Sequence, residues 1–180
     1  MARLTLLEYP DPRLRKRADP VRRFDTALSG LIDDMFETMY ATQGMGLAAT
    51  QVDVHQQLIT IDVSGNATAP EVFINPRILS SSRAALVEES CLSLPGVCEL
   101  VKRSTVLRVH ALDRTGRTCE RTLEGLLAVC LQHEMDHLVG KLFVDRLSLL
   151  QRLRVRRNLQ RRPAGSAAAQ APAAMHVSSI

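Results

Sequence analysis

The segment HEMDH at residues 133–137 constrains the fold of this 180-residue chain more than any other feature. On an α-helix, residues four apart project from one face, so His133 and His137 can reach the same divalent cation. Glu134 lies one step around the helix, where it can reach a water molecule at that ion and act as a general base. Three apolar residues lie on the histidine side in the preceding turns: Leu126, Val129 and Cys130. The pattern therefore predicts a helix over about residues 124–138 with its metal-binding face turned inward.

The pattern leaves the third protein ligand open. Beyond His137 the only acidic residue is Asp145, and Phe143 stands where a metzincin would carry its third histidine. Unless Asp145 serves, the ligand comes from upstream, which excludes most zinc proteases with this motif. Cys91 lies where a strand-like run ends, and a thiolate there would bind a cation strongly. Cys130 is a rival because it shares the histidine face, and periodicity does not choose between the two.

The rest of the chain predicts an α+β fold. Apolar residues at helical spacing indicate a helix from Asp25 or Thr26 to about Ala41 and another over residues 149–162. The glycine-rich residues 44–51 indicate a loop. Short β-like runs follow one another in between, at residues 57–63, 71–75, 84–88, 105–111 and 117–123. This order predicts mostly antiparallel short strands packed around a central helix that carries HEMDH, with an N-terminal and a C-terminal helix.

The length fits one domain, which we expect to span residues 1–162. Residues 163–180 consist largely of Ala, Pro, Ser, Gly and Gln, a low-complexity composition that predicts a disordered C-terminal tail. No apolar run has the length of a membrane span, and the N-terminus lacks the apolar stretch of a signal peptide. The sequence therefore predicts a cytoplasmic protein with no membrane partner.

The net charge of +4 is unevenly distributed. Residues 141–180 carry a net +7, so the preceding 140 residues carry a net −3. With no Trp and 3% aromatic residues, the body also lacks side chains on which bases could stack. This distribution argues against sequence-specific nucleic-acid binding by the body.

Three segments, taken together, resemble the signature motifs of bacterial peptide deformylases. They are GMGLAATQ (44–51), ESCLSLP (89–95) and QHEMDHLVGKLFVDRLS (132–148), and the resemblance extends from about Leu4 to Leu159. YPDPRLRKRA near the N-terminus and FINP (73–76) are also typical of the family. The resemblance implies a metal-dependent amidohydrolase that removes the N-formyl group from the N-terminal formyl-methionine of newly synthesised polypeptides and releases formate.

The resemblance also implies a role for each site residue. The metal ligands would be Cys91, His133 and His137, with water as the fourth ligand. The catalytic groups would be Glu134 as the base, with the Gln51 side-chain amide and the Leu92 backbone N–H stabilising the oxyanion. One divalent ion per chain is expected, Fe²⁺ natively, with Zn²⁺, Ni²⁺ or Co²⁺ able to replace it.

Substrate contacts are expected from two backbone segments and an apolar pocket. Gly44 to Gly46 and Glu89 to Ser90 would hydrogen-bond the peptide main chain as an added strand. The methionine side chain would pack against four apolar residues: Met45, Leu126, Val129 and Cys130. Ser90 departs from the family, which usually has Gly before the cysteine; a positive φ there would strain Ser90, and otherwise its side chain only narrows the cleft.

Further expectations concern partners and alternatives. The arginine-rich C-terminal helix and the nascent-chain substrate suggest docking near the ribosomal exit through RNA phosphates. Asp136 orients a ligand, pairs with a nearby arginine, or is a solvated charge on the helix. Two rival functions stay open: an inactive homologue that keeps the metal but binds a partner, motivated by Ser90, and a protease that uses Asp145 as its third ligand.

Overall fold

The computed structural model describes residues 2–160 and 176–177. Its helices are α1 (Thr26–Ala41), α2 (Gly125–Leu138) and α3 (Leu149–Gln160), joined by three short 3₁₀ turns, η1 (Pro12–Arg15), η2 (Ala49–Val52) and η3 (Phe143–Arg146). Its strands are β1 (Gly46–Ala48), β2 (Leu58–Ile61), β3 (Glu71–Cys91), β4 (Leu94–Leu112), β5 (Thr118–Glu124) and β6 (His176–Val177). Among these described residues, no helix is long and apolar enough to cross a membrane.

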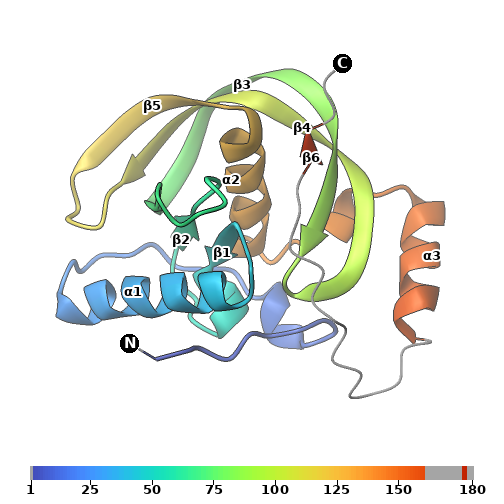
Figure 1. Cartoon of the computed structure of the whole chain (residues 1–180), viewed down its shortest axis with the longest axis horizontal. Helices are drawn as coiled ribbons and strands as arrows, with labels where there is room; N and C mark the ends of the chain where they lie inside the picture. Colours follow the sequence, from blue (N-terminus) through green and yellow to red (C-terminus); the bar gives the residue numbers. More distant parts are fainter. Residues whose placement is uncertain (1, 161–175, 178–180) are drawn as a thin grey trace.

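The strands form one antiparallel sheet that curves around α2 (Figure 1). The order across the sheet is β1-β2-β3-β4-β5, and every pairing is antiparallel. The short strand β6 pairs with β3, also antiparallel. This arrangement confirms the predicted α+β fold, with antiparallel strands around the helix that carries HEMDH, an N-terminal helix and a C-terminal helix.

The prediction of only short strands was wrong for the central hairpin. The runs at 71–75 and 84–88 belong to the single strand β3, and the run at 105–111 is the second half of β4. Pro76 does not end β3, because a register shift between Ile74 and Arg77 takes the proline out of the ladder. Residues 77–84 are exposed one after another. No buried face imposes an apolar alternation there, so the sequence pattern does not reveal the strand.

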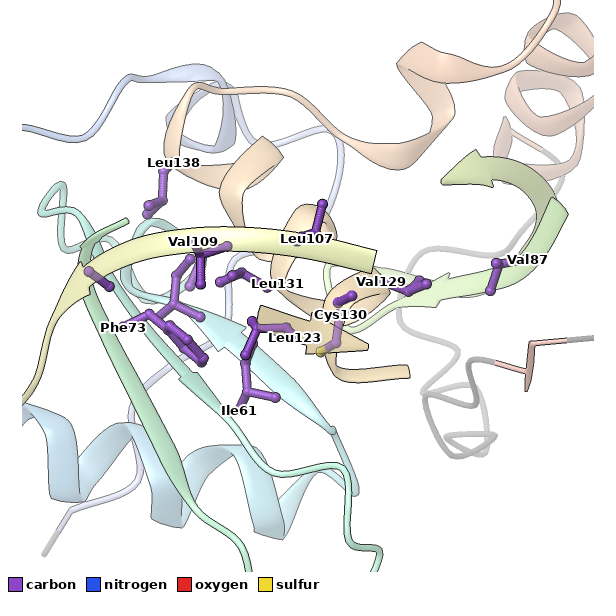
Figure 2. Close-up of a cluster of buried hydrophobic side chains, with 14 of the residues drawn as sticks. Ile61, Phe73, Val87, Leu107, Val109, Leu123, Val129, Cys130, Leu131 and Leu138 are labelled. Carbon is purple, nitrogen blue, oxygen red and sulfur yellow. The ribbon is translucent and has the colours of Figure 1, made fainter. Parts of the chain in front are cut away.

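Helix α2 begins where β5 ends and lies inside the curve of the sheet (Figure 1). Residues 128–131 are fully buried, and apolar side chains from β2, β3, β4 and β5 pack against them (Figure 2). These side chains include Ile61, Phe73, Leu107, Val109 and Leu123. A helix packed on so many sides positions its side chains rigidly, which is what a metal site requires.

Helix α1 lies beside β1 and β2 (Figure 1). The Asp25 carboxylate accepts a hydrogen bond from the backbone N–H of Leu28 at 3.0 Å, which confirms the predicted helix start. Ile32, Met35 and Met39 are fully buried and pack on β1 and β2. This packing supports the glycine-rich loop and β1, which form one wall of the cleft described below.

Helix α3 agrees with the predicted C-terminal helix. Unlike α2, it leaves most of its apolar side chains exposed. Val155 is buried and Leu159 is partly buried, both in a small cluster that also includes Cys91. Leu149, Leu150 and Leu153 are between 54% and 78% exposed. The predicted disordered tail lies outside the described residues, except for the two residues of β6.

Candidate metal centre

Cys91, His133 and His137 come together where the C-terminal half of α2 meets the end of β3. Their ligand atoms all lie within 4.8 Å of one another, and all three residues are buried. Cys91 Sγ lies 3.2 Å from Nε2 of His137. Cys91 ends β3, whereas both histidines come from α2 and their rings lie 5.1 Å apart, edge to face. Cys91 lies 42 positions before His133 and 46 before His137 in the chain. The three residues share one small buried volume because α2 runs beneath the end of the β3–β4 hairpin.

The arrangement fits a divalent cation. Tetrahedral coordination by sulfur at ~2.3 Å and nitrogen at ~2.1 Å implies ligand atoms about 3.6 Å apart. Nδ1 of His133 lies 2.8 Å from a carboxylate oxygen of Glu89, which leaves Nε2 as the available ring atom. Burial, together with the charges of His133 and Arg103, lowers the pKa of His137, so its ring is neutral, the form that binds a metal.

The structure rejects both rival ligands. Asp145 is not in the cluster: its carboxylate pairs with Arg15 and accepts a hydrogen bond from the Leu142 N–H at 2.9 Å. Cys130 is fully buried one turn before the histidines, but its sulfur faces Gly46 and the Glu134 carboxylate instead of the cluster. Among the described residues, the group that could hold a metal is therefore Cys91, His133 and His137.

A narrow cleft opens beside this cluster. It is lined by Met45, Gly46, Gln51, Ser90, Cys91, Leu92, His133 and Glu134. A β-carbon at Gly46 would lie 2.5 Å from Glu134 Oε1 and 2.7 Å from Cys130 Sγ, so only glycine allows the loop to approach this closely. A β-carbon at Gly44 would lie 2.7 Å from Leu92. The glycines of this loop therefore bring its backbone up to the side chains of the cleft.

Glu134 lies in the cleft with an unusual environment for an acid. Its side chain is buried, and its Oε2 atom has no hydrogen-bond partner. Burial raises the pKa of Glu134 to about 7 despite the nearby charge of His133. A carboxyl group with this pKa exchanges a proton readily near neutral pH, as a general base or acid must.

Gln51 is held in one orientation by its surroundings. Its side-chain oxygen accepts a hydrogen bond from the Ala48 N–H at 2.9 Å. Its Nε2 therefore faces the cleft, where it donates to Ser93 Oγ at 3.1 Å and lies 3.8 Å from Cys91 Sγ. The structure thus presents an amide N–H donor beside the candidate metal position.

A buried ionic network lies on the other side of His133. Arg103 donates to both carboxylate oxygens of Glu89, at 2.5 and 3.0 Å, and to Asp136 at 2.7 Å. Asp136 also accepts two hydrogen bonds from Arg146, at 2.6 and 2.7 Å. Burial alone would raise the pKa of Glu89, but the hydrogen bonds from Arg103 and His133 hold it at about 2. The network keeps an ionised carboxylate against His133.

Sequence reasoning missed Arg103, which is 2% exposed. Arginine in an alternating strand normally marks the solvent side, so only the structure reveals that this guanidinium is buried. The sequence left three roles open for Asp136, and the structure shows the pairing with arginine: the residue is buried and not a solvated charge. Through Arg103 that pairing also reaches Glu89, the partner of His133.

The predicted substrate residues divide into two groups. Met45, Gly46 and Ser90 line the cleft. Glu89 points inward to the ionic network, while Leu126, Val129 and Cys130 belong to the apolar cluster under the sheet. Ser90 is not among the described residues with positive φ, so its replacement of glycine causes no backbone strain there, and its side chain stands at the cleft.

Comparison with known proteins agrees with this geometry. The family model for polypeptide deformylases matches residues 3–153. A peptide deformylase of Hahella chejuensis is 54% identical over 162 residues, which cover 89% of this chain and 96% of that protein.

Solved structures agree as well. The crystal structure of a peptide deformylase from Legionella pneumophila has a TM-score of 0.84 and 50% identity, and covers 90% of this chain and 100% of that one. A peptide deformylase of Synechococcus elongatus, crystallised with actinonin, has a TM-score of 0.82 and 42% identity, and covers 87% and 86% of the two chains. The chain belongs to the peptide deformylase family.

Proposed function

We propose that this chain hydrolyses the formyl group from the N-terminal formyl-methionine of newly synthesised polypeptides and releases formate. Membership of the peptide deformylase family supports the reaction. The observation that supports the chemistry most directly is the cluster of Cys91, His133 and His137 beside a buried, unpaired Glu134 oxygen. We propose that one catalytic domain, residues 1–162, carries the activity.

The three clustered residues would hold one divalent cation. Such an ion supplies a Lewis acid that polarises a carbonyl group and activates water for attack. One thiolate and two imidazoles suit several first-row metals, and we propose Fe²⁺ as the native ion, with Zn²⁺, Ni²⁺ or Co²⁺ as replacements. Metal analysis of protein purified without oxygen tests this choice; a sample dominated by zinc under those conditions would argue against iron.

Glu134 acts as the proton carrier of the reaction. Its unpaired Oε2 takes a proton from the attacking water, whose oxygen bonds to the formyl carbon. The carbon–nitrogen bond then breaks, and Glu134 returns the proton to the departing amine nitrogen. The products are formate and a peptide whose N-terminal methionine has a free amino group. The Glu134 carboxylate is restored for the next cycle.

Two donors oppose the negative charge that develops on the formyl oxygen. Gln51 would donate from Nε2, which its hydrogen bond with Ala48 turns toward the cleft. The backbone N–H of Leu92, at the turn between β3 and β4, would be the second donor. Loss of one such donor typically lowers the rate by ~10²–10³-fold.

The peptide is expected to bind between the glycine loop and the end of β3. Met45, Gly46 and Ser90 line the cleft from these two sides. Gly44 and the backbone at Glu89 extend the same two walls. Main-chain hydrogen bonds do not depend on the following side chains, which suits an enzyme that processes many nascent chains. Leu126, Val129 and Cys130 support the proposed methionine pocket from below.

Formate release from formyl-Met-Ala-Ser by freshly prepared iron- or nickel-loaded protein tests the proposed function. Release of formate without cleavage of internal peptide bonds is the expected result. An inactive homologue would bind metal but release no formate, and a protease would cleave internal bonds; either outcome would overturn the proposal.

We also propose that α3 docks the enzyme on the ribosome, in the cytoplasm. Four exposed arginines on α3 support this proposal: Arg152, Arg154, Arg156 and Arg157. Their charge would bind RNA phosphates, and the exposed Leu149 and Leu150 would add apolar contact area. Co-sedimentation with ribosomes should fall when the four arginines are changed to Gln.

The matched control changes four exposed arginines elsewhere, namely Arg22, Arg23, Arg108 and Arg117, to Gln. This variant should co-sediment nearly as well as the unmodified protein. An equal loss in both variants would show a general charge effect and would contradict docking through α3.

A further inference from the structure

The edge of β3 that leads into the cleft is paired with the C-terminal strand β6. β4 occupies one edge of β3 from Ile74 to Cys91, and β2 occupies the other edge only at residues 71–74. β6 pairs antiparallel with Val87 and Glu88 on this second edge, and it also lies against α2 (Figure 1). Two residues further along β3, Ser90 begins the wall of the cleft.

The side chains of this stretch fix the direction of its backbone. Val87 is fully buried and packs in the cluster around α2, and Glu89 is fully buried in the ionic network. Glu88, between them, is exposed on the other face. The backbone N–H and C=O groups of this stretch therefore lie in the plane of the sheet and point alternately toward β4 and toward the opposite edge. At that opposite edge, any extended chain can pair with the groups that face it, whatever its side chains.

A peptide substrate and β6 would run along this edge in the same direction, an argument that rests on the proposed function. The formyl end of a substrate lies at Cys91, so a peptide antiparallel to β3 runs from Cys91 back toward Val87. If its first residue lies opposite Cys91, its fourth lies opposite Glu88 and its fifth opposite Val87. β6 has the same polarity, since His176 pairs with Glu88 and Val177 with Val87.

We infer that the edge of β3 at Val87 and Glu88 binds the fourth and fifth residues of a long peptide substrate, and that β6 occupies this edge until such a peptide displaces it. The C-terminal segment is then an intramolecular competitor. It opposes peptides of four or more residues and leaves shorter ones unaffected, because these end before they reach Glu88.

The test uses the full-length, metal-loaded chain with His176→Pro and Val177→Pro together. Proline removes the backbone N–H that a strand needs for pairing. For a formylated heptapeptide, KM should fall about fivefold, the size expected from losing one or two net hydrogen bonds. For a formylated dipeptide, KM should stay the same, and kcat should stay the same for both peptides.

The matched control places two prolines in the same tail outside β6, as Ala168→Pro and Ala169→Pro, and should leave both KM values unchanged. Backbone hydrogen exchange gives an independent readout, since residues 84–90 should exchange faster in the β6 variant than in the control. The inference would be overturned if the β6 variant and the unmodified enzyme had the same KM for the heptapeptide, or if residues 84–90 exchanged equally fast in the β6 variant and the control. Absence of formate release from the dipeptide by the unmodified enzyme would instead overturn the proposed function.

Discussion

Two glutamates lie on the two sides of His133, and the protein shifts their pKa values in opposite directions. On the cleft side, Glu134 is buried with an unpaired oxygen, and burial raises its pKa to about 7. On the other side, Glu89 is equally buried, but hydrogen bonds from Arg103 and His133 outweigh burial and hold its pKa at about 2. The two carboxyl groups belong to the same residue type and lie near the same imidazole. The difference between their pKa values therefore comes from their surroundings alone.

This comparison separates groups that perform chemistry from groups that hold them in place. A buried acid with an unpaired oxygen destabilises the fold and persists where a reaction needs a movable proton. A buried acid with all its partners orients its neighbours but has no proton to give at neutral pH. We therefore expect changes at Glu134 to affect rate, and changes in the Arg103 network to affect stability.

The largest expected effect is on catalysis by Glu134→Gln. The amide cannot accept a proton from water, so kcat for formate release should fall by ~10³-fold. Metal content should be unchanged, and the free energy of unfolding should change by less than about 1 kcal/mol, because no ion pair is lost. A kcat within about tenfold of the unmodified enzyme would remove Glu134 from the role of proton carrier.

Arg103→Met should have the largest effect on stability. It leaves the carboxylates of Glu89 and Asp136 buried with one partner fewer, and breaking a buried ion pair in this way costs about 3–5 kcal/mol. Urea unfolding measures the change. The control is Arg108→Met on the same strand, whose side chain is 62% exposed and pairs with Glu120. It should cost less than about 1 kcal/mol, and similar losses in both variants would contradict a special role for the buried network.

The pKa of Glu89 predicts how stability depends on pH. The folded chain holds this carboxyl at a pKa of about 2, below its ordinary value of 4.5, so the unfolded chain takes up the proton first. The contribution to stability is therefore present above about pH 4.5 and is lost as the pH falls toward 2. Urea unfolding of chelator-treated protein between pH 6 and pH 3 should show this loss, and Glu89→Gln should make the dependence shallower. The same slope in both proteins would contradict the assignment.

Arg146→Met should have the smallest effect. Arg146 is 42% exposed and lies at the solvent end of the network, and Asp136 keeps its hydrogen bond from Arg103 after the change. A loss of about 1 kcal/mol is expected in urea unfolding, with kcat unchanged. A loss as large as that of Arg103→Met would mean that the network acts as one unit instead of weakening toward its exposed end.

Much of the site could be predicted from sequence because its chemistry depends on local spacing. His133, Glu134 and His137 follow from helical periodicity, and the helix itself follows from its buried apolar face. Cys91 could not be separated from Cys130 by spacing, because the choice depends on where the end of β3 meets α2. The resemblance to a family favoured Cys91, and the structure brings its sulfur to the histidines.

The missed features share one physical cause. Arg103 looked like a solvent-facing residue of a strand, and only the convergence of Glu89 and Asp136 from two other elements makes its burial possible. The long β3–β4 hairpin was divided into short runs because both of its faces are exposed around residues 77–84. Contacts between distant segments determine both the burial of Arg103 and the length of the hairpin. Local periodicity does not reveal such contacts.

The most direct test of this account is the absorption spectrum of the cobalt-substituted protein. A cobalt ion bound by a thiolate shows sulfur-to-metal charge transfer in the near ultraviolet, and an ion bound by nitrogen and oxygen alone does not. The band should be present in the unmodified protein and in Cys130→Ser, and absent in Cys91→Ser. A band that survives in Cys91→Ser, or disappears in Cys130→Ser, would contradict the assignment of Cys91 as the third ligand.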